Sequence, residues 1–219
     1  MSNGSVITLD GLAATGKTAV AVALSKRLGW HVLYSGLLYR YLAYCMQKEG
    51  FDVDMRTIPD AWVRRLGLIT CEVDQEGVLH TFVDGEDMGD SLAQESVGSY
   101  ASIIARNEYL REVLLPIQRA YRQPPGLIAE GRDMSSVVFR DAKYKIFLKA
   151  SDTLRAERRF LQLKKSGKDA IMHDIVESIR QRDARDMQRA QKSQMCDVQI
   201  IDTTHCTIDE IVTMIMADM

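Results

Sequence analysis

The fold of this chain is decided by one stretch near its start, Gly11-Leu12-Ala13-Ala14-Thr15-Gly16-Lys17-Thr18. It matches the pattern G-x-x-x-x-G-K-[ST], and it stands between a short apolar run and a longer run with helical spacing. Glycines permit a tight loop whose backbone N–H groups point at phosphate oxygens, and the helix N-terminus adds a favourable dipole. Lys17 would supply a charge to the β- and γ-phosphates, and Thr18 would offer its hydroxyl to Mg²⁺. The stretch therefore predicts a nucleoside triphosphate site.

Short apolar runs alternate with helical patterns over most of the chain. This alternation predicts an α/β fold in which a five-stranded parallel sheet is flanked by helices. Strands are expected at 6–9, 31–33, 127–130, 144–148 and 198–201. Helices are expected at 17–28, 37–47, 152–165, 173–191 and 207–216.

One region departs from the alternation. Runs at 68–73 and 79–83, separated by glycine turns, predict a small antiparallel β insertion, and a helical pair follows at 94–122. A basic turn at 164–169 joins two helices and suggests a short helical lid. We therefore expect a core formed by residues 1–58 and 123–219, an insertion with the helical pair at 59–122, and a lid at 160–175.

Composition limits the classes of function. The chain has 219 residues, with 28 Lys and Arg against 30 Asp and Glu, so its net charge of -2 argues against a binder of nucleic acid polymers. No apolar run is long enough for a secretory signal or a membrane span. The four cysteines have no closely spaced pair, which disfavours zinc and is typical of reduced thiols in a cytoplasmic protein. They are Cys45, Cys71, Cys196 and Cys206.

Arginines gather where a second phosphate would bind. Arg40 follows the second expected strand and Arg132 the third. The carboxyl ends of parallel strands form the ligand crevice, and the planar guanidinium group binds phosphate through two hydrogen bonds. We therefore expect both side chains to face the phosphate loop.

Two helical stretches add further arginines. Arg182, Asp186 and Arg189 follow i, i+4, i+7 spacing and share one helix face, and Arg155 and Arg159 lie one turn apart. A solvated helix crossed by salt bridges would show the same pattern as 180–189, so this stretch alone leaves both interpretations open.

Taken together, these motifs resemble bacterial-type cytidylate kinases. The resemblance extends from about residue 5 to the end of the chain, in the order and spacing of that family. It implies a P-loop kinase core with a lid, ATP as phosphoryl donor, Mg²⁺ as cofactor, CMP and dCMP as acceptors, and a monomer. It is carried by the phosphate loop and by 35–40, 118–119, 125–128, 131–134, 182–189 and 201–204.

The resemblance also implies a role for each matching residue. The loop, Arg155 and Arg159 would bind ATP, with Arg158 as a rival of Arg159. The acceptor phosphate would be held by Ser35, Arg40, Arg132 and Arg189, with Arg182 nearby. Cytosine would be read by Ser102, Arg111 and Asp133, and the sugar by Asp186 with Arg182. The catalytic residues would be Lys17, Arg132, Arg159 and Arg189, and the metal ligand Thr18.

Some positions depart from the family pattern. Tyr34 stands where Asp is usual, Ser135 replaces a glycine, and Leu92 or Ser91 replaces a common arginine. The stretch 190–196 lacks the usual Pro-Leu. These differences bear on acceptor affinity and sugar preference more than on the reaction type, and Glu130 can still act as an outer-sphere ligand of Mg²⁺.

Other acceptors and another class of protein remain alternatives. A P-loop kinase for UMP, AMP or a non-nucleotide such as shikimate would share the loop, although Ser102, Arg111 and Asp133 favour cytosine because its exocyclic amine needs an acceptor. A nucleotide-dependent switch would need no second substrate. The absence of an Asn-Lys-x-Asp motif and the surplus of arginines disfavour a switch.

Overall fold

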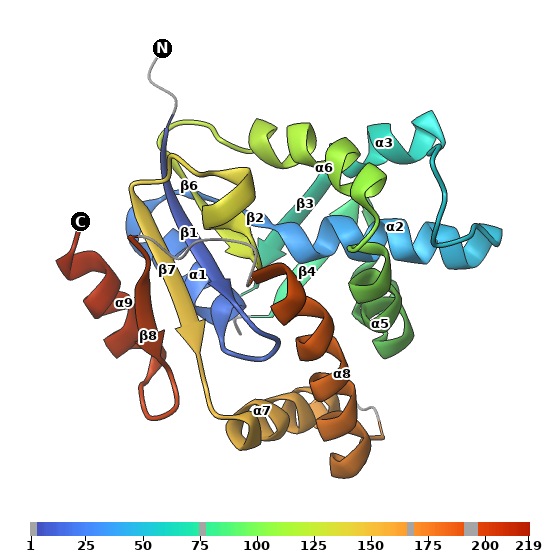
Figure 1. The fold of residues 1–219 in the computed structure, drawn as a ribbon. Helices are drawn as coiled ribbons and strands as arrows, with labels where there is room; N and C mark the ends of the chain where they lie inside the picture. The colour runs from blue at the N-terminus through green and yellow to red at the C-terminus, as the bar shows by residue number, and fades with distance from the viewer. Residues whose placement is uncertain (1–3, 75–77, 166–168, 191–196) are drawn as a thin grey trace. The chain divides into compact units, whose positions relative to one another are not determined.

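The computed structural model describes residues 4–74, 78–165, 169–190 and 197–219 (Figure 1). The chain forms two compact units. The first consists of Met1–Leu33 and Tyr121–Met219, and the second of Tyr34–Ala120. The motif-bearing residues are therefore divided between two bodies, each of which has its own sheet.

The first unit is built on a five-stranded sheet in the order β2-β6-β1-β7-β8. Strand β1 pairs in parallel with β6 and β7, and β7 pairs in parallel with β8. Helix and turn residues lie against β1 from outside the sheet, so its apolar residues Val6, Ile7 and Leu9 are removed from water. This burial explains why the strand reads as a continuous apolar run. The strands are β1 (Ser5–Gly11), β2 (His31–Tyr34), β6 (Gly126–Gly131), β7 (Tyr144–Lys149) and β8 (Gln199–Asp202).

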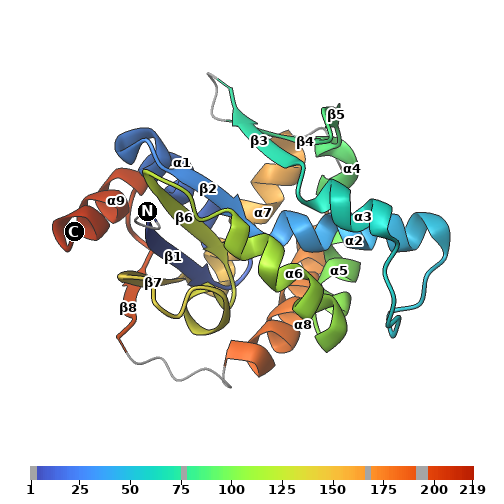
Figure 2. The same cartoon turned by 90° about the horizontal axis from the view of Figure 1, so that it is seen from above.

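Helices cover both faces of this sheet. Helices α1 (Lys17–Leu28) and α9 (Ile208–Ala217) pack together on one face, as Figure 2 shows. A single π-helical turn, η1 (Met134–Val138), lies against β1 and β6 on the other. Helices α7 (Asp152–Lys165) and α8 (Met172–Ala190) pack on each other around a small apolar core. Its buried residues are Ala156, Ile175 and Ile179.

The second unit is mainly helical and carries the small antiparallel sheet in the order β3-β4-β5. Helix α2 is its centre, because it packs against α3, α4 and α5. The helices are α2 (Ser35–Glu49), α3 (Asp60–Leu66), α4 (Gly89–Ala93), α5 (Glu95–Ile104) and α6 (Glu108–Ala120). The strands are β3 (Ile69–Val73), β4 (Leu79–Val83) and β5 (Glu86–Asp87).

The structure confirms the α/β class, the five-stranded sheet, the antiparallel insertion and the helical pair. Four short elements were not expected: α3, α4, β5 and η1. The second unit also begins at Tyr34, because α2 packs on the insertion's helices, whereas the sequence placed residues 34–58 with the core. Of the expected lid, residues 166–168 lie outside the described residues. None of the described helices is both long and apolar enough to cross a membrane.

Candidate active site

The phosphate loop joins the end of β1 to the start of α1 and needs glycine at two positions. A Cβ atom at Gly11 would lie 2.3 Å from the carbonyl oxygen of Leu148 on β7, a separation that no side chain tolerates. Gly16 has φ 93°, in the left-handed region that favours glycine. The glycines of the motif therefore allow the loop to turn tightly over the neighbouring strand and to enter the helix.

Lys17 is buried in this loop, with only 4% of its surface exposed. Its Nζ donates hydrogen bonds to the carbonyl oxygen of Leu12 at 2.7 Å and to Thr15 Oγ1 at 3.4 Å. Burial lowers the pKa of Lys17 to about 7, because removal from water disfavours the charged form. An anion bound in the loop would favour the ammonium form.

Charged groups from β6 and α8 surround Lys17. The positive charge of Arg132 also lowers the pKa of Lys17, whereas the carboxylates of Glu130 and Asp186 raise it. Arg132 Nε donates to Asp186 Oδ2 at 2.8 Å, and the Asp186 side chain is 5% exposed. The end of β6 and the face of α8 are thereby linked beside the phosphate loop, within the first unit.

The oxygens near the loop suit a magnesium ion. Thr18 Oγ1 donates to Glu130 Oε2 at 2.9 Å, so a hydroxyl and a carboxylate lie together at the start of α1. Mg²⁺ prefers oxygen ligands and usually binds proteins through one or two of them, with phosphates and waters completing the shell. The described ranges contain no group of three or more His, Cys, Asp or Glu that could hold a metal ion.

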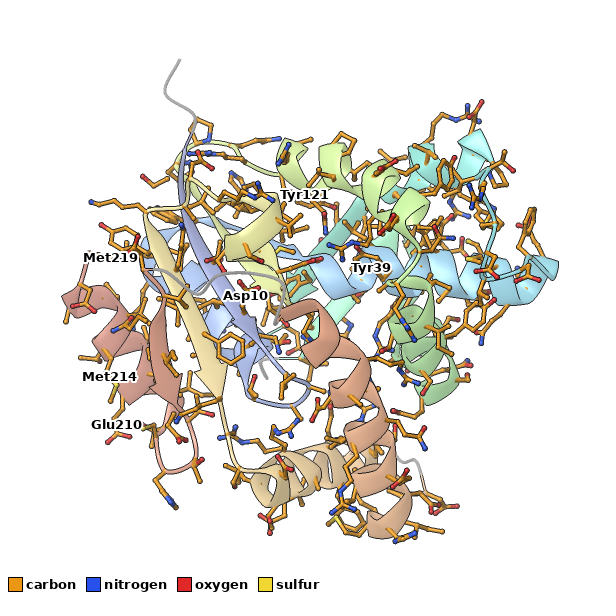
Figure 3. The ribbon with its side chains drawn as sticks, viewed as in Figure 1. Asp10, Tyr39, Tyr121, Glu210, Met214 and Met219 are labelled. Atoms are coloured by element: carbon orange, nitrogen blue, oxygen red, sulfur yellow. The ribbon has the colours of Figure 1, made fainter. Side chains whose placement is uncertain are left out.

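Asp10 fastens the base of the loop to η1. This residue lies near the end of β1 (Figure 3) and is 2% exposed. Its carboxylate accepts hydrogen bonds from Met134 N at 2.8 Å, Ser135 N at 2.9 Å and Ser135 Oγ at 2.6 Å. Burial raises the pKa of Asp10, although the bonds from Ser135 and Met134 lower it. The turn that follows Arg132 is therefore held at its first two helical residues.

The three neighbouring arginines of α7 have different surroundings. Arg155 is 2% exposed and pairs with Asp183 at 2.6 Å and with Asp152 at 2.7 Å. Its Nη1 also donates to the carbonyl oxygen of Ala13 in the phosphate loop at 3.2 Å. Arg159, one turn later, donates to Gln162 on the same helix at 2.8 Å. Arg155 thus braces α7 against α8 and the loop.

Arg158 is the member of this group that lies beside the loop's glycine. Its Nη1 is 3.6 Å from where a Cβ of Gly16 would be. Thr203, which is fully buried, accepts from Arg158 at its hydroxyl at 3.2 Å and at its carbonyl at 3.0 Å. The Thr203 hydroxyl in turn donates to the Thr15 carbonyl at 3.0 Å. Arg158, the alternative to Arg159 for ATP binding, is therefore held against the loop by the segment after β8.

The residues of the second unit that the sequence predicts to bind the acceptor nucleotide lie on α2, α5 and α6. Arg40 Nη1 donates to the carbonyl oxygens of Leu92 at 2.6 Å and Gln94 at 3.2 Å. Its guanidinium also lies against Gly98, where a Cβ would come within 2.6 Å of Nη2. Helices α4 and α5 therefore fix the Arg40 head group, and the backbone at Leu92 serves as its acceptor.

Comparison with known proteins gives the family. The model of the cytidylate kinase family matches residues 7–219. The chain belongs to the cytidylate kinase family. A relative named cytidylate kinase from Pseudomonas entomophila (strain L48) is 39% identical over 100% of this chain and 96% of its own. The cytidylate kinase of Bordetella pertussis (strain Tohama I / ATCC BAA-589 / NCTC 13251) is 42% identical over 96% of this chain and 93% of its own. The solved structure of TT1252 from Thermus thermophilus aligns with 100% of this chain and 99% of its own at 14% identity, with a TM-score of 0.46.

In this member of the cytidylate kinase family, the described structure brings together only some of the expected residues. The first unit gathers the phosphate loop, Arg132 and Asp186, with Asp133 preceding η1 and the half-buried Arg182 on α8. The side chain of Arg189 lies outside the described residues. The second unit holds four expected residues: Ser35, Arg40, Ser102 and Arg111.

Several residues that shape the site were given no role by the sequence analysis. Asp10, Asp183, Thr203 and Gln118 are all buried polar residues. A signal existed for Gln118, since it follows Leu110 and Leu114 at i+4 and i+8 and is a polar residue on the apolar face of α6. Asp183 and Thr203 lie inside quoted motifs but were given no role, because their partners are distant in sequence.

Proposed function

We propose that this chain transfers the γ-phosphoryl group of ATP to CMP and dCMP, forming CDP and dCDP. The observation that carries the proposal is the family match, which extends over residues 7–219 and so includes both units. Relatives that bear the name cytidylate kinase align with nearly the whole chain. The phosphate loop alone would support any nucleotide kinase.

The donor nucleotide would be bound by the loop and its surroundings. Backbone N–H groups of residues 11–18 would hold the phosphates, and the Lys17 ammonium would exchange its bond to the Leu12 carbonyl for phosphate oxygens. Arg158 or Arg159 would neutralise the transferring group, and the position of Arg158 beside Gly16 favours the former. Arg155 is expected to hold α7 and α8 in place, because its guanidinium is buried among protein groups.

Magnesium would be held at Thr18, with Glu130 acting through a water molecule. This hydroxyl and carboxylate fit a hard cation, and the bound ion would supply charge neutralisation at the β- and γ-phosphates. Isothermal titration of the protein with ATP, with and without Mg²⁺, tests the assignment. Thr18→Val should weaken ATP binding only when Mg²⁺ is present.

The acceptor would be recognised by guanidinium and small polar groups. Ser35, Arg40, Arg132, Arg182 and Arg189 would hold its phosphate through charge-assisted hydrogen bonds. Ser102, Arg111 and Asp133 would read cytosine, since a hydroxyl or carboxylate oxygen accepts from the exocyclic amine and arginine donates to O2 and N3. Asp186, with Arg182, would bind the sugar hydroxyls.

Phosphoryl transfer requires mainly that the two nucleotides be aligned and that the negative charge of the transferring group be stabilised. The acceptor phosphate is already ionised, so the attacking oxygen needs no general base. Lys17 and the arginines would stabilise the charge that develops on the transferring group, and residues 160–175 would close and exclude water. Exclusion of water suppresses ATP hydrolysis, because a bound water would otherwise compete with the acceptor.

A substrate panel tests the proposal. Turnover with ATP should be high for CMP and dCMP and low for UMP and AMP. Arg132→Ala and Arg182→Ala should each lower kcat/KM for CMP by about 10²–10³-fold, by analogy with the loss of a single charge-stabilising donor. Arg64, exposed on α3, gives a matched Arg→Ala control with unchanged kinetics. Wild-type turnover of CMP in the Arg132 variant would refute the acceptor assignment.

The family resemblance further implies a monomer of the cytoplasm that binds neither nucleic acid polymers nor membranes. The nearly balanced charge of the chain agrees with this expectation. Light scattering at several protein concentrations tests the oligomeric state, since a monomer keeps a mass of about 24.7 kDa throughout.

A further inference from the structure

Gln118 and Ser35 form a buried polar contact inside the second unit. Gln118 Nε2 donates to Ser35 Oγ at 2.8 Å. Gln118 is 2% exposed and Ser35 3%, so water competes little with this bond. Burying an amide costs free energy unless it is hydrogen-bonded, and Gln118 lies on the otherwise apolar face of α6. The bond to Ser35 offsets this cost.

Ser35 stands where its hydroxyl could meet an anion. It is the first residue of α2, and the preceding Tyr34 makes no side-chain cap at this helix start. The first N–H groups of a helix have no partner within the helix, and the dipole favours negative charge there. The geometry therefore suits a phosphate at Ser35, in agreement with the role that the family assigns to it.

The direction of the bond decides what the Ser35 hydroxyl can do next. A hydroxyl has one proton to donate and lone pairs that accept. Because the Gln118 amide donates to Oγ, the Ser35 proton remains available for another acceptor. A phosphate has only acceptor oxygens, so it requires the hydroxyl in this donating orientation.

We propose that Gln118 is a positioning residue that holds the Ser35 hydroxyl as a hydrogen-bond donor to the phosphate of the acceptor nucleotide. The inference rests on the proposed function, in which Ser35 binds that phosphate. Gln118 itself would touch no substrate. It acts by fixing one rotamer and one proton direction before the acceptor arrives, which lowers the ordering cost of binding.

Two substitutions of similar size separate donation from packing. Gln118→Met removes the donor and retains the volume, so the KM for CMP should rise about 3- to 10-fold, the value of one hydrogen bond. Gln118→Glu reverses the polarity, because an ionised carboxylate accepts the Ser35 proton and turns it away from the phosphate. Its KM for CMP should rise further, while the KM for ATP stays within about twofold in both variants. Gln47→Glu, an exposed change of the same kind on α2, should have no effect.

A double-mutant cycle tests whether Gln118 acts through Ser35. Ser35→Ala should raise the KM for CMP, and adding Gln118→Met to it should change the KM by less than about twofold. Two independent effects would instead multiply. Thermal melts of each variant identify any loss of folding, and unchanged ATP kinetics show that the donor site is intact.

The outcomes separate this inference from the proposed function. If the wild-type protein does not phosphorylate CMP, or Ser35→Ala leaves its KM unchanged, the acceptor assignment itself fails. If Ser35→Ala raises the KM but Gln118→Met does not, Gln118 has no positioning role. If Gln118→Glu behaves like the wild type even as the pH is raised until its buried carboxyl ionises, the amide accepts from Ser35 and the inferred direction is wrong.

Discussion

Removing Arg155 should damage folding far more than nucleotide binding. Its side chain is 2% exposed, and its guanidinium contacts Asp183, Asp152 and the Ala13 carbonyl at 2.6, 2.7 and 3.2 Å. The Asp183 side chain is itself only 11% exposed. Arg155→Met would therefore leave a buried carboxylate without its partner.

The magnitude follows from the asymmetry of buried ion pairs. Removing one partner costs about 3–5 kcal/mol, whereas replacing both by apolar groups of similar volume is often close to neutral. Arg155→Met and Asp183→Leu should each lower the melting temperature by about 6–20 °C, at about 2–4 °C per kcal/mol for a chain of this size. The double variant should recover most of this loss, because the apolar pair would extend the core of Ala156 and Ile179 between α7 and α8.

The assay is thermal and urea unfolding of the three variants, followed by ATP kinetics on those that remain folded. Burial raises the pKa of Asp183, and Arg155 lowers it. Without Arg155 the carboxyl would protonate more readily, so the destabilisation of Arg155→Met should shrink as the pH falls. An unchanged melting temperature together with a tenfold rise in the KM for ATP would refute the reasoning and return Arg155 to the ATP-binding role that the family resemblance implies.

Three further predictions concern buried charge and a helix start. Lys17→Met should abolish activity but stabilise the fold, and the gain in stability should be larger at pH 7 than at pH 10. The pKa of Lys17 is about 7 in the folded protein and 10.5 in the unfolded chain, so the wild-type protein becomes more stable as the pH rises between these values. The methionine variant lacks this dependence on pH. The exposed Lys26→Met is the control in pH-dependent unfolding. Ser135→Ala should cost about 1.5–3 kcal/mol in urea unfolding, since Asp10 loses one of its donors. Thr207→Ala should cost about 1 kcal/mol by removing the capping box of α9, and an unchanged urea midpoint would contradict this.

Periodic patterns allowed most of the fold to be predicted. The long helices and buried strands were placed because their apolar residues recur at fixed spacings over many positions. Elements α3, α4 and η1 were missed because five to seven residues carry too little periodicity to stand out. The boundary at Tyr34 could not be foreseen either, since α2 joins the second unit through contacts with α4 and α5 that no local pattern reveals.

The same distinction holds for the site: features encoded by neighbouring residues were predicted, and features that depend on residues distant in sequence were not. The phosphate loop was recognised because its spacing and its flanking elements are contiguous. Arg155, Arg158 and Arg159 could not be told apart, since all three fall within about one turn of the same helix and the burial of each depends on partners that are distant in sequence. Asp183 selects Arg155 for burial, and Thr203 holds Arg158 beside Gly16.

Ser135 illustrates how a departure from the family pattern can be read physically. A glycine at this position would be needed if the backbone had a positive φ. Among the residues that the structure describes, the non-glycine residues with positive φ are Ala14, Asp84 and Asp197, so Ser135 needs no glycine conformation. Its hydroxyl instead donates to Asp10, a carboxylate whose burial disfavours the charged form. The extra donor strengthens the tie between the base of the phosphate loop and η1. Serine in place of glycine should therefore make the turn that follows Arg132 more rigid and leave the reacting groups unaltered.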